Sequence, residues 1–420
     1  MADTSDVVIV GGGIIGSSIA WHLREQGVKS VRIIERDNMF RGTSAAAAGF
    51  ISIWAVSAPT QQAEEAELER YGLEFYARLH ANHDIDFRQN GLLWVAGNEA
   101  AWKQMQAMVA HPEEPKTHAL DSAQVHDATA GMISAGEILG GVLQPGAGQL
   151  AASKVGIALA NQLDERGVVI DAGRSVTGLV QRGGRIVGVD TSTGHVAADK
   201  VVVAAGAWSN PLLEPHGVYL PMVPHVASRL IARPMGIPAA MPALFLTGIA
   251  SDGQAGNVLW VRQHEGGLVF GGMYSIFPRD MFVQSQLPDQ FSDIPIDGAL
   301  EAQRRAEFAT RMLPAFARRS GLRVSHGAPL YTPDRRLLAG SVEGIDGLFV
   351  ATGDNEFGMT HGPGLGRALA EHMTRQSGAP WVRMEQWKID RFGTRYRNGA
   401  QVQIDVERML LEQNDGFTLT

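Results

Sequence analysis

Three glycines near the start of the chain have the spacing of a phosphate-binding turn. An apolar run leads directly into Gly11, Gly13 and Gly16 of a G-x-G-x-x-G pattern. Gly11 permits a tight strand-to-helix turn, Gly13 lets backbone approach a pyrophosphate, and Gly16 lets the helix pack closely on the strand. The phosphates would then face the main-chain N–H groups of Ile14 and Ile15 at the positive end of that helix. The pattern predicts a dinucleotide-binding unit.

An acidic residue follows at the distance that this unit requires. Glu35 ends a second apolar run, and its carboxylate can accept hydrogen bonds from both hydroxyls of a ribose. Its negative charge would also repel the 2′-phosphate of an NADP-type ligand. A nicotinamide dehydrogenase would use the same acid, so the first 35 residues leave the kind of dinucleotide open.

A second glycine-rich segment lies near the other end of the chain. Residues 347–353 predict a buried strand, and the glycines at 358, 362, 364 and 366 mark the start of a helix. We expect both ends of the chain to close one dinucleotide site.

Composition limits the classes of protein that fit. The chain has 420 residues, is 45% apolar and carries a formal net charge of −8, which predicts two or three globular domains and disfavours nucleic acid as a partner. With no cysteine, it has no disulfide and no zinc–thiolate site, so redox chemistry would need a bound cofactor; no metal is expected. No apolar run reaches the ~20 residues of a membrane helix and no secretory signal is visible, so we expect a cytoplasmic protein.

The elements that would position these residues alternate along the chain. Residues 5–55 predict strand, helix, strand and loop, and 63–81 predict a helix. Residues 99–140 and 298–319 are expected to be helical, whereas 225–290 is rich in strands.

Several further motifs occur in a fixed order. They are Glu35-Arg36, the loop from Gly42 to Gly49, Ala205-Gly206-Ala207-Trp208, Tyr331-Thr332-Pro333-Asp334, the late glycine loop with Pro363, and Asp390-Arg391-Phe392. With the opening turn, they resemble the D-amino acid oxidase superfamily of flavoproteins, especially its glycine oxidase, sarcosine oxidase and dimethylglycine dehydrogenase branches. The resemblance covers most of the chain.

The resemblance implies a discontinuous, interleaved fold. A Rossmann-like α/β FAD-binding domain of the glutathione reductase type would comprise residues 1–55, 145–222 and 322–380. An α+β substrate domain with a large antiparallel sheet would comprise 56–144 and 223–321. Residues 381–420 would form an extension that packs on the FAD domain.

It also implies which residues hold FAD. The pyrophosphate would lie at Gly11, Gly13 and Gly16, the adenosine ribose at Glu35, the adenine at Arg36 and Val176, and the pyrimidine edge of the flavin at Gly358 and Met359. In chain order, the cofactor-binding residues are Gly11, Gly13, Ile14, Ile15, Gly16, Glu35, Arg36, Thr43, Ser44, Ala48, Gly49, Val176, Ala205, Gly206, Trp208, Gly353, Gly358 and Met359. Dimethylglycine dehydrogenases carry a Trp-His pair whose histidine is bonded to flavin, and this chain has Ala45 and Ala46 there. Since it also lacks the cysteine that monomeric sarcosine oxidases use, FAD should be non-covalent.

At the positions of the substrate site, this sequence differs from the enzymes that it resembles. The arginine that holds the substrate carboxylate in glycine oxidase is replaced by Ala328, and the lysine of sarcosine oxidase by Thr360. Glu356 stands where glycine oxidases have an arginine, and an acid there would suit a cationic amine. If a carboxylate is bound, Arg229 and Arg262 are the remaining candidates.

Other side chains beside these motifs are candidates for the substrate pocket. The polar ones are His225, Tyr274, Tyr331 and His361, and the apolar ones are Phe50, Trp54, Trp94 and Met273. Each has an ordinary alternative role in the core.

The function implied is FAD-dependent oxidation of the C–N bond of an amine or amino acid, with a secondary or N-methyl amine favoured. Hydride would pass to flavin N5, and the imine would hydrolyse. Val269 replaces the lysine that sarcosine oxidases carry above the flavin, so oxygen and another electron acceptor both stay open. The alternatives are a 2-hydroxy acid dehydrogenase and a non-catalytic or electron-transfer flavin subunit of a larger amine dehydrogenase; a homo-oligomer is also open.

Overall fold

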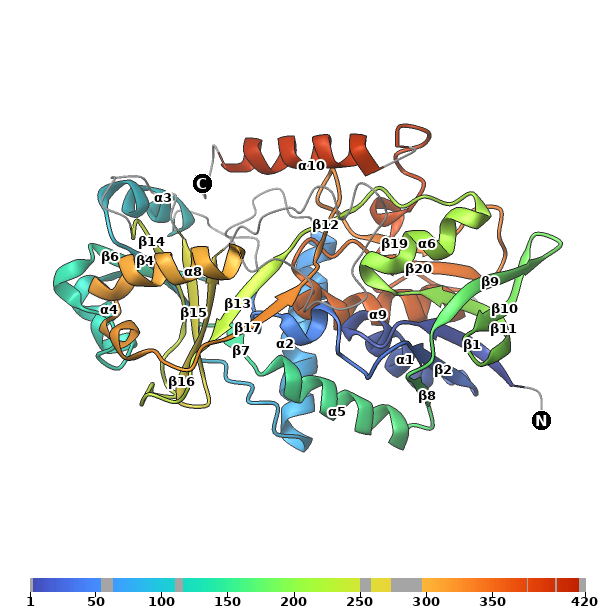
Figure 1. The fold of residues 1–420 in the computed structure, drawn as a ribbon, viewed down its shortest axis with the longest axis horizontal. Helices are drawn as coiled ribbons and strands as arrows, with labels where there is room; N and C mark the ends of the chain where they lie inside the picture. The colour runs from blue at the N-terminus through green and yellow to red at the C-terminus, as the bar shows by residue number, and fades with distance from the viewer. Residues whose placement is uncertain are drawn as a thin grey trace.

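Two large sheets form the two halves of the molecule in Figure 1. The computed structural model describes residues 3–53, 63–109, 116–249, 258–272, 297–375, 377–396 and 399–414. Among these, no helix is long and apolar enough to cross a membrane.

The first sheet has parallel strands at its centre. In spatial order it contains β19 (Leu338–Ser341), β20 (Leu348–Thr352), β11 (Gly194–Val203), β1 (Thr4–Val10), β2 (Val31–Glu35) and β8 (Val169–Ala172), and β10 (Arg185–Thr191) and β9 (Val176–Arg182) continue from β11. β20, β11, β1, β2 and β8 run parallel, and β19 pairs antiparallel with β20. Val7 and Ile9 pack on one face of β1, and Val8 and Val10 pack on the other. Burial on both faces explains why these strands are continuous apolar runs.

The second sheet is antiparallel except for one parallel pair, β4 with β14. Its order is β17 (Arg323–Gly327), β13 (Ala227–Ile231), β16 (Gly267–Gly272), β15 (Leu259–His264), β14 (Ala243–Thr247), β4 (Leu92–Ala96), β6 (Gly140–Gln144) and β5 (His118–Asp121). One face packs on α8 through Leu230 and Val261, whereas the opposite face carries Trp94, Phe245 and Trp260. Two short pairs complete the strands: β3 (Phe50–Ile51) with β7 (Gly148–Gln149), and β12 (Val223–Pro224) with β18 (Leu330–Tyr331).

Helices cover both sheets. They are α1 (Ile14–Glu25), α2 (Ala63–Asn82), α3 (Glu99–Val109), α4 (Ser122–Ala128), α5 (Ala152–Glu165), α6 (Ser209–Leu213), α8 (Asp297–Phe308), α9 (Gly358–Thr374) and α10 (Gly399–Asn414). In Figure 1, α1 and α9 lie with the first sheet, α3, α4 and α8 lie with the second, and α10 runs along the top of the view above the middle of the molecule, where it contacts β12.

Helix α9 packs tightly between α1 and α2. A Cβ on Gly362 would lie 2.9 Å from Ile14 Cγ1, and one on Gly366 would lie 2.6 Å from the Ser18 carbonyl carbon. A Cβ on Gly364 would come equally close to Leu68 Cα, at 2.6 Å. The late glycines therefore let α9 approach both helices, which brings the late glycine segment to the first β-turn-α unit.

Two expected helices are shorter than predicted. Within residues 99–140, α3 and α4 are separated by the edge strand β5, whose mostly exposed side chains give no alternating pattern. The helix expected over 298–319 ends at Phe308, and two 3₁₀ turns follow, the second beginning at Pro314. Proline cannot continue a helix because it lacks an N–H group and its ring clashes with the preceding turn.

Candidate functional site

The turn between β1 and α1 is built as the glycine pattern predicts. Gly11 has a φ of +109°, and a Cβ there would collide with the Ala204 carbonyl. A Cβ on Gly16 would collide with the carbonyl of Gly11. The N-cap residue of α1, Gly13, has no side chain to cap the helix, and the Ser44 hydroxyl accepts a hydrogen bond from Ile14 N at 3.0 Å. A helix start with this little side-chain cover suits an anion.

Glu35 lies beside this turn at the end of β2. Its carboxylate accepts hydrogen bonds from the N–H groups of Gly12 at 2.8 Å and Asp37 at 3.0 Å. The neighbouring Arg36 guanidinium stacks on the Trp208 ring at 4.0 Å. Residues predicted to contact the dinucleotide therefore come together from three segments of the chain: the glycine turn, the end of β2 and the segment that contains Trp208.

Two other predicted segments border the same turn. Arg174 N donates to the Glu35 carbonyl at 3.0 Å, which sets the start of β9, at Val176, close to β2. Ala204 N donates to the Val10 carbonyl at 2.9 Å, so Ala205 and Gly206 follow directly beside the glycine turn.

The segment after Gly42 crosses from the first sheet to the second. Thr43 Oγ1 accepts a hydrogen bond from Ala328 N at 3.0 Å, which ties the start of this segment to the strand region before β18. Gly49 has a φ of +85°, and a Cβ there would collide with the Leu150 carbonyl. The next residue, Phe50, has its ring edge-on to Trp260 at 5.5 Å.

The start of α9 meets this segment. The Tyr76 hydroxyl of α2 donates to the Met359 carbonyl at 2.6 Å, and both residues are buried. Gly353 has a φ of +70°, and a Cβ on Gly358 would collide with the Asp354 carboxylate. A Cβ on Gly362 would lie only 2.9 Å from Ile14 Cγ1, so the late glycine loop lies beside the first β-turn-α unit, as the sequence predicts.

Tyr331, Glu356 and His225 meet where these segments converge. The rings of His225 and Tyr331 are 5.5 Å apart, and His225 N donates to the Pro329 carbonyl at 2.7 Å. The Tyr331 hydroxyl donates a hydrogen bond to the Glu356 carboxylate. Burial nevertheless raises the pKa of Glu356 from 4.5 to about 7, because desolvation outweighs this hydrogen bond.

The backbone that presents Glu356 is unusual. Asn355 and Glu356 have φ values of +47° and +73°, which non-glycine residues seldom adopt. The Asn355 side chain supports the turn by accepting from Thr332 N at 3.0 Å and donating to the Gly353 carbonyl at 2.7 Å. Sequence reasoning missed Asn355, although asparagine is among the residues that tolerate this conformation best.

His361 lies deeper, between α9 and α2. Its Nε2 is 3.1 Å from Glu69 Oε1, and both side chains are buried. Burial by itself lowers the pKa of His361, but the hydrogen bond and charge of Glu69 raise it more, so its pKa is above 6.5. The pairing ties two helices together, and the only sign of Glu69 in the sequence is its place on an apolar helix face.

Arg229 and Arg262 approach the segment 45–48 from the second sheet. Arg229 donates to the carbonyls of Ala45 and Ala47, and Arg262 Nε donates to the carbonyl of Ala48. Burial lowers the pKa of Arg262 to about 9 and that of Arg229 to about 10, so both stay charged at neutral pH.

Aromatic side chains line the neighbouring face of the second sheet. Trp94 stacks on Phe245 with ring centroids 4.2 Å apart, and Phe50 contacts Phe245 at 5.3 Å. Of the other predicted pocket residues, Trp54, Met273 and Tyr274 lie outside the described residues.

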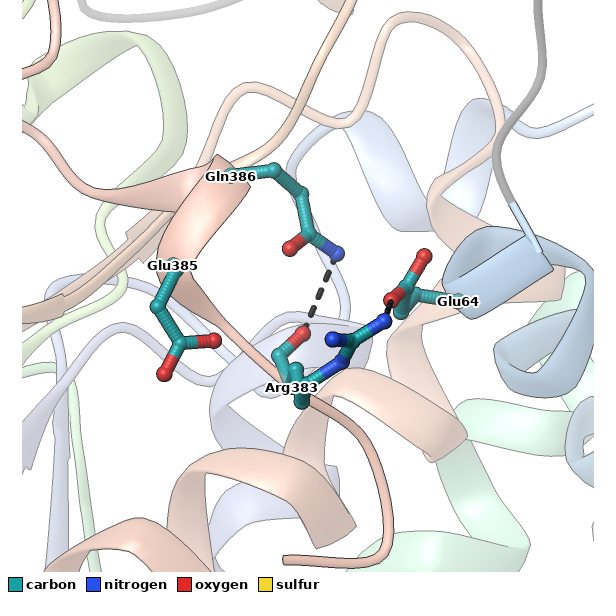
Figure 2. A pocket seen from close by; sticks show the side chains of 4 residues that line it. All are labelled: Glu64, Arg383, Glu385 and Gln386. Atoms are coloured by element: carbon teal, nitrogen blue, oxygen red, sulfur yellow. Dashed lines mark hydrogen bonds and ion pairs between the residues drawn. The ribbon is translucent and has the colours of Figure 1, made fainter.

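Figure 2 shows a separate surface cavity of about 680 Å³ between the start of α2 and residues 383–386. Arg383 Nη2 lies 3.1 Å from Glu64 Oε1, and Gln386 Nε2 donates to the Arg383 carbonyl at 3.0 Å. Glu385 completes the lining. None of the residues predicted from the sequence lines this cavity.

The model of the DAO family, described as FAD dependent oxidoreductase, matches residues 6–372. The chain belongs to this family. The predicted resemblance and fold class are therefore confirmed, and FAD is the cofactor of DAO flavoenzymes.

Relatives of the chain in the DAO family include oxidases and dehydrogenases. 4-Methylaminobutanoate oxidase (formaldehyde-forming) of Paenarthrobacter nicotinovorans is 29% identical over 93% of this chain and 46% of its own length. Glycine oxidase of Pseudomonas aeruginosa is 29% identical over 88% of this chain and 94% of its own. The solved L-proline dehydrogenase from P. horikoshii has the same fold, with a TM-score of 0.77 at 20% identity over 93% of this chain and 98% of that one. This chain spans about half the length of the first of these relatives.

The residues present fit FAD. The turn has no room for side chains at Gly11 and Gly16. The N-cap residue of α1, Gly13, has no side chain that could bond to the first N–H groups of the helix. The segment from Ala45 to Ala48 consists of alanines, which offer no side chain for a covalent bond. The site is suited to a dinucleotide held without a covalent bond.

Proposed function

We propose that the chain oxidises the C–N bond of an amine or amino acid with FAD, with a secondary or N-methyl amine as the favoured substrate. The meeting of Tyr331, Glu356 and His225 beside the late glycine loop is the observation that carries the proposal. The names of two relatives, a methylaminobutanoate oxidase and a glycine oxidase, support the class of substrate.

In this proposal, residues from both halves of the molecule would hold FAD. The N–H groups at the start of α1 hold the pyrophosphate, and Glu35 holds the ribose, with Arg36 and Trp208 at the adenine. The segment from Thr43 to Gly49 and the start of α9 hold the ring, where main-chain N–H groups favour negative charge.

Glu356 accepts the proton that a protonated amine must lose before oxidation. A protonated amine has no lone pair on nitrogen, so it must lose its proton before the adjacent C–H bond can give up hydride. A carboxylate with a pKa of about 7 is well matched to accept that proton at neutral pH. The Tyr331 hydroxyl keeps the carboxylate oriented through its hydrogen bond.

FAD, when bound, supplies the acceptor for the hydride. Phe50, Trp94, Phe245 and Trp260 keep that side of the site apolar, which limits the access of water to the reacting carbon. Water then hydrolyses the imine product after it leaves the apolar site.

The test is an anaerobic reduction of the purified flavoprotein with a panel of primary, secondary and N-methyl amines, amino acids and 2-hydroxy acids. Bleaching of the flavin absorption by secondary or N-methyl amines supports the proposal. Bleaching by 2-hydroxy acids alone would support the hydroxy acid alternative. No bleaching by any compound would favour a non-catalytic flavin subunit. A protein that takes up no FAD would refute all three functions.

Repeating the reduction in air separates an oxidase from a dehydrogenase, since only an oxidase regains its colour rapidly. The domain boundaries, the electron acceptor, self-association and cytoplasmic residence stay predictions.

A further inference from the structure

We propose that Arg229 and Arg262 are positioning residues that hold the segment 45–48 against the flavin end of the site, and so set both the affinity for FAD and its reduction potential. The inference rests on the FAD placement proposed above. It assigns to these arginines a role different from the substrate-carboxylate role considered from the sequence.

The segment 45–48 cannot anchor itself. It consists of four consecutive alanines, so no side chain in it can form a hydrogen bond. Only its first two residues belong to a short 3₁₀ turn, and it ends before β3. Its carbonyl groups therefore depend on donors from elsewhere in the fold.

The two arginines supply those donors from the second sheet. Arg229 lies on β13 and Arg262 on β15, with β16 between the two strands. Their neighbours Leu230 and Val261 pack on the α8 face, so strand alternation turns both arginines toward the opposite face. Three of the four alanine carbonyls, those of residues 45, 47 and 48, accept their hydrogen bonds.

Both guanidinium groups are buried. Arg262 is 1% exposed and Arg229 is 8% exposed. Neither forms an ion pair with any residue that the structure describes, and the nearby Asp86 carboxylate is paired with Arg88 at 3.2 Å. The Nε atom of Arg229 has no hydrogen-bond partner among the described residues.

Two buried positive charges at this place would favour a negative charge next to them. Reduction of a flavin adds negative charge to its ring, so the arginines should stabilise the reduced form relative to the oxidised form. Their hydrogen bonds to the segment 45–48 should also keep the ring-binding surface formed before FAD arrives, which improves affinity by preorganisation.

The test compares Arg229→Gln and Arg262→Gln with the charge-retaining variants Arg229→Lys and Arg262→Lys. Arg305→Gln is the matched control, because Arg305 is also 8% exposed in the same half of the molecule but is paired with Glu301 at 3.0 Å on α8. FAD affinity is measured by fluorescence titration of the stripped full-length protein. The potential is measured by reduction against a reference dye, and folding by circular dichroism.

Each glutamine variant should weaken FAD binding by about tenfold or more and make the potential more negative. Each lysine variant should have a flavin reduction potential close to that of the wild type, because it keeps the positive charge. Arg305→Gln should alter stability but neither flavin property. A purely structural role would instead lower affinity in step with stability and leave the potential of the remaining holoprotein unchanged, and that result would overturn the proposal.

A separate variant tests the FAD placement itself. Gly13→Val fills the space beside Ser44, where a Cβ would lie 3.0 Å from the hydroxyl oxygen. If Gly13→Val abolishes FAD binding while the glutamine variants match the wild type, the arginine proposal alone fails. If Gly13→Val binds FAD normally, the proposed placement of FAD fails as well.

Discussion

The raised pKa of Glu356 makes a specific prediction about stability. A carboxyl whose pKa is higher in the folded chain than in the unfolded chain stabilises the fold while protonated. That contribution is complete below the unfolded value of 4.5 and is lost as the pH rises through about 7. Glu356→Gln keeps the size of the side chain and an acceptor for Tyr331, but it cannot ionise.

The size of the effect follows from the same values. A rise in pKa from 4.5 to about 7 corresponds to about 3 kcal/mol at ~1.4 kcal/mol per pKa unit. Since the side chain is only half-buried, solvent screening reduces this figure, and we expect about 1–2 kcal/mol. The free energy of unfolding of Glu356→Gln minus that of the wild type should therefore be about 1–2 kcal/mol larger at pH 8 than at pH 4.5.

The assay is urea unfolding of the full-length protein stripped of FAD, at several pH values between 4.5 and 8. Glu343→Gln is the control, since Glu343 is exposed in the turn after β19. Its difference from the wild type should not change with pH. A pH-independent difference for Glu356→Gln would refute the reasoning that burial dominates at this carboxyl.

Three further outcomes are expected. Acid precipitation should release all flavin into the supernatant, because residues 45–46 are alanines; flavin that stays in the pellet would show a covalent bond. Tyr76→Phe should cost about 1–3 kcal/mol in urea unfolding, because the Met359 carbonyl loses its buried donor at 2.6 Å, and unchanged stability would argue against this anchor. Tyr331→Phe should move the rising limb of the pH profile for flavin reduction to higher pH, because the hydrogen bond that lowers the pKa of Glu356 is lost; a midpoint at unchanged or lower pH would contradict this.

The nucleotide end of the site could be predicted from the sequence because its signals are local. Gly11, Gly13 and Gly16 are needed by one turn, and Glu35 ends the next strand of the same unit. Apolar runs such as 7–10 and 201–203 identified buried strands, since burial on both faces removes the polar alternation. The order of the motifs then identified the family.

The edge strands of the sheets and the ends of the helices were harder to predict from the sequence. β5 pairs with β6 at the margin of the second sheet, so its sequence lacks the apolar signal of a central strand. The helix α8 ends at Phe308 although the amphipathic pattern continues, and Pro314, which cannot continue a helix, begins the second of the two 3₁₀ turns that follow.

The chemical environment of the site depended on tertiary structure. Nothing within the sequence around Glu356 shows that Tyr331 lies beside it, or that desolvation raises its pKa. The contact of Arg229 and Arg262 with alanines about 180 to 215 residues earlier has the same origin. Spacing along the chain encodes turns, strands and helix faces, whereas burial and pairing between distant segments are set only when the two sheets and α9 pack together.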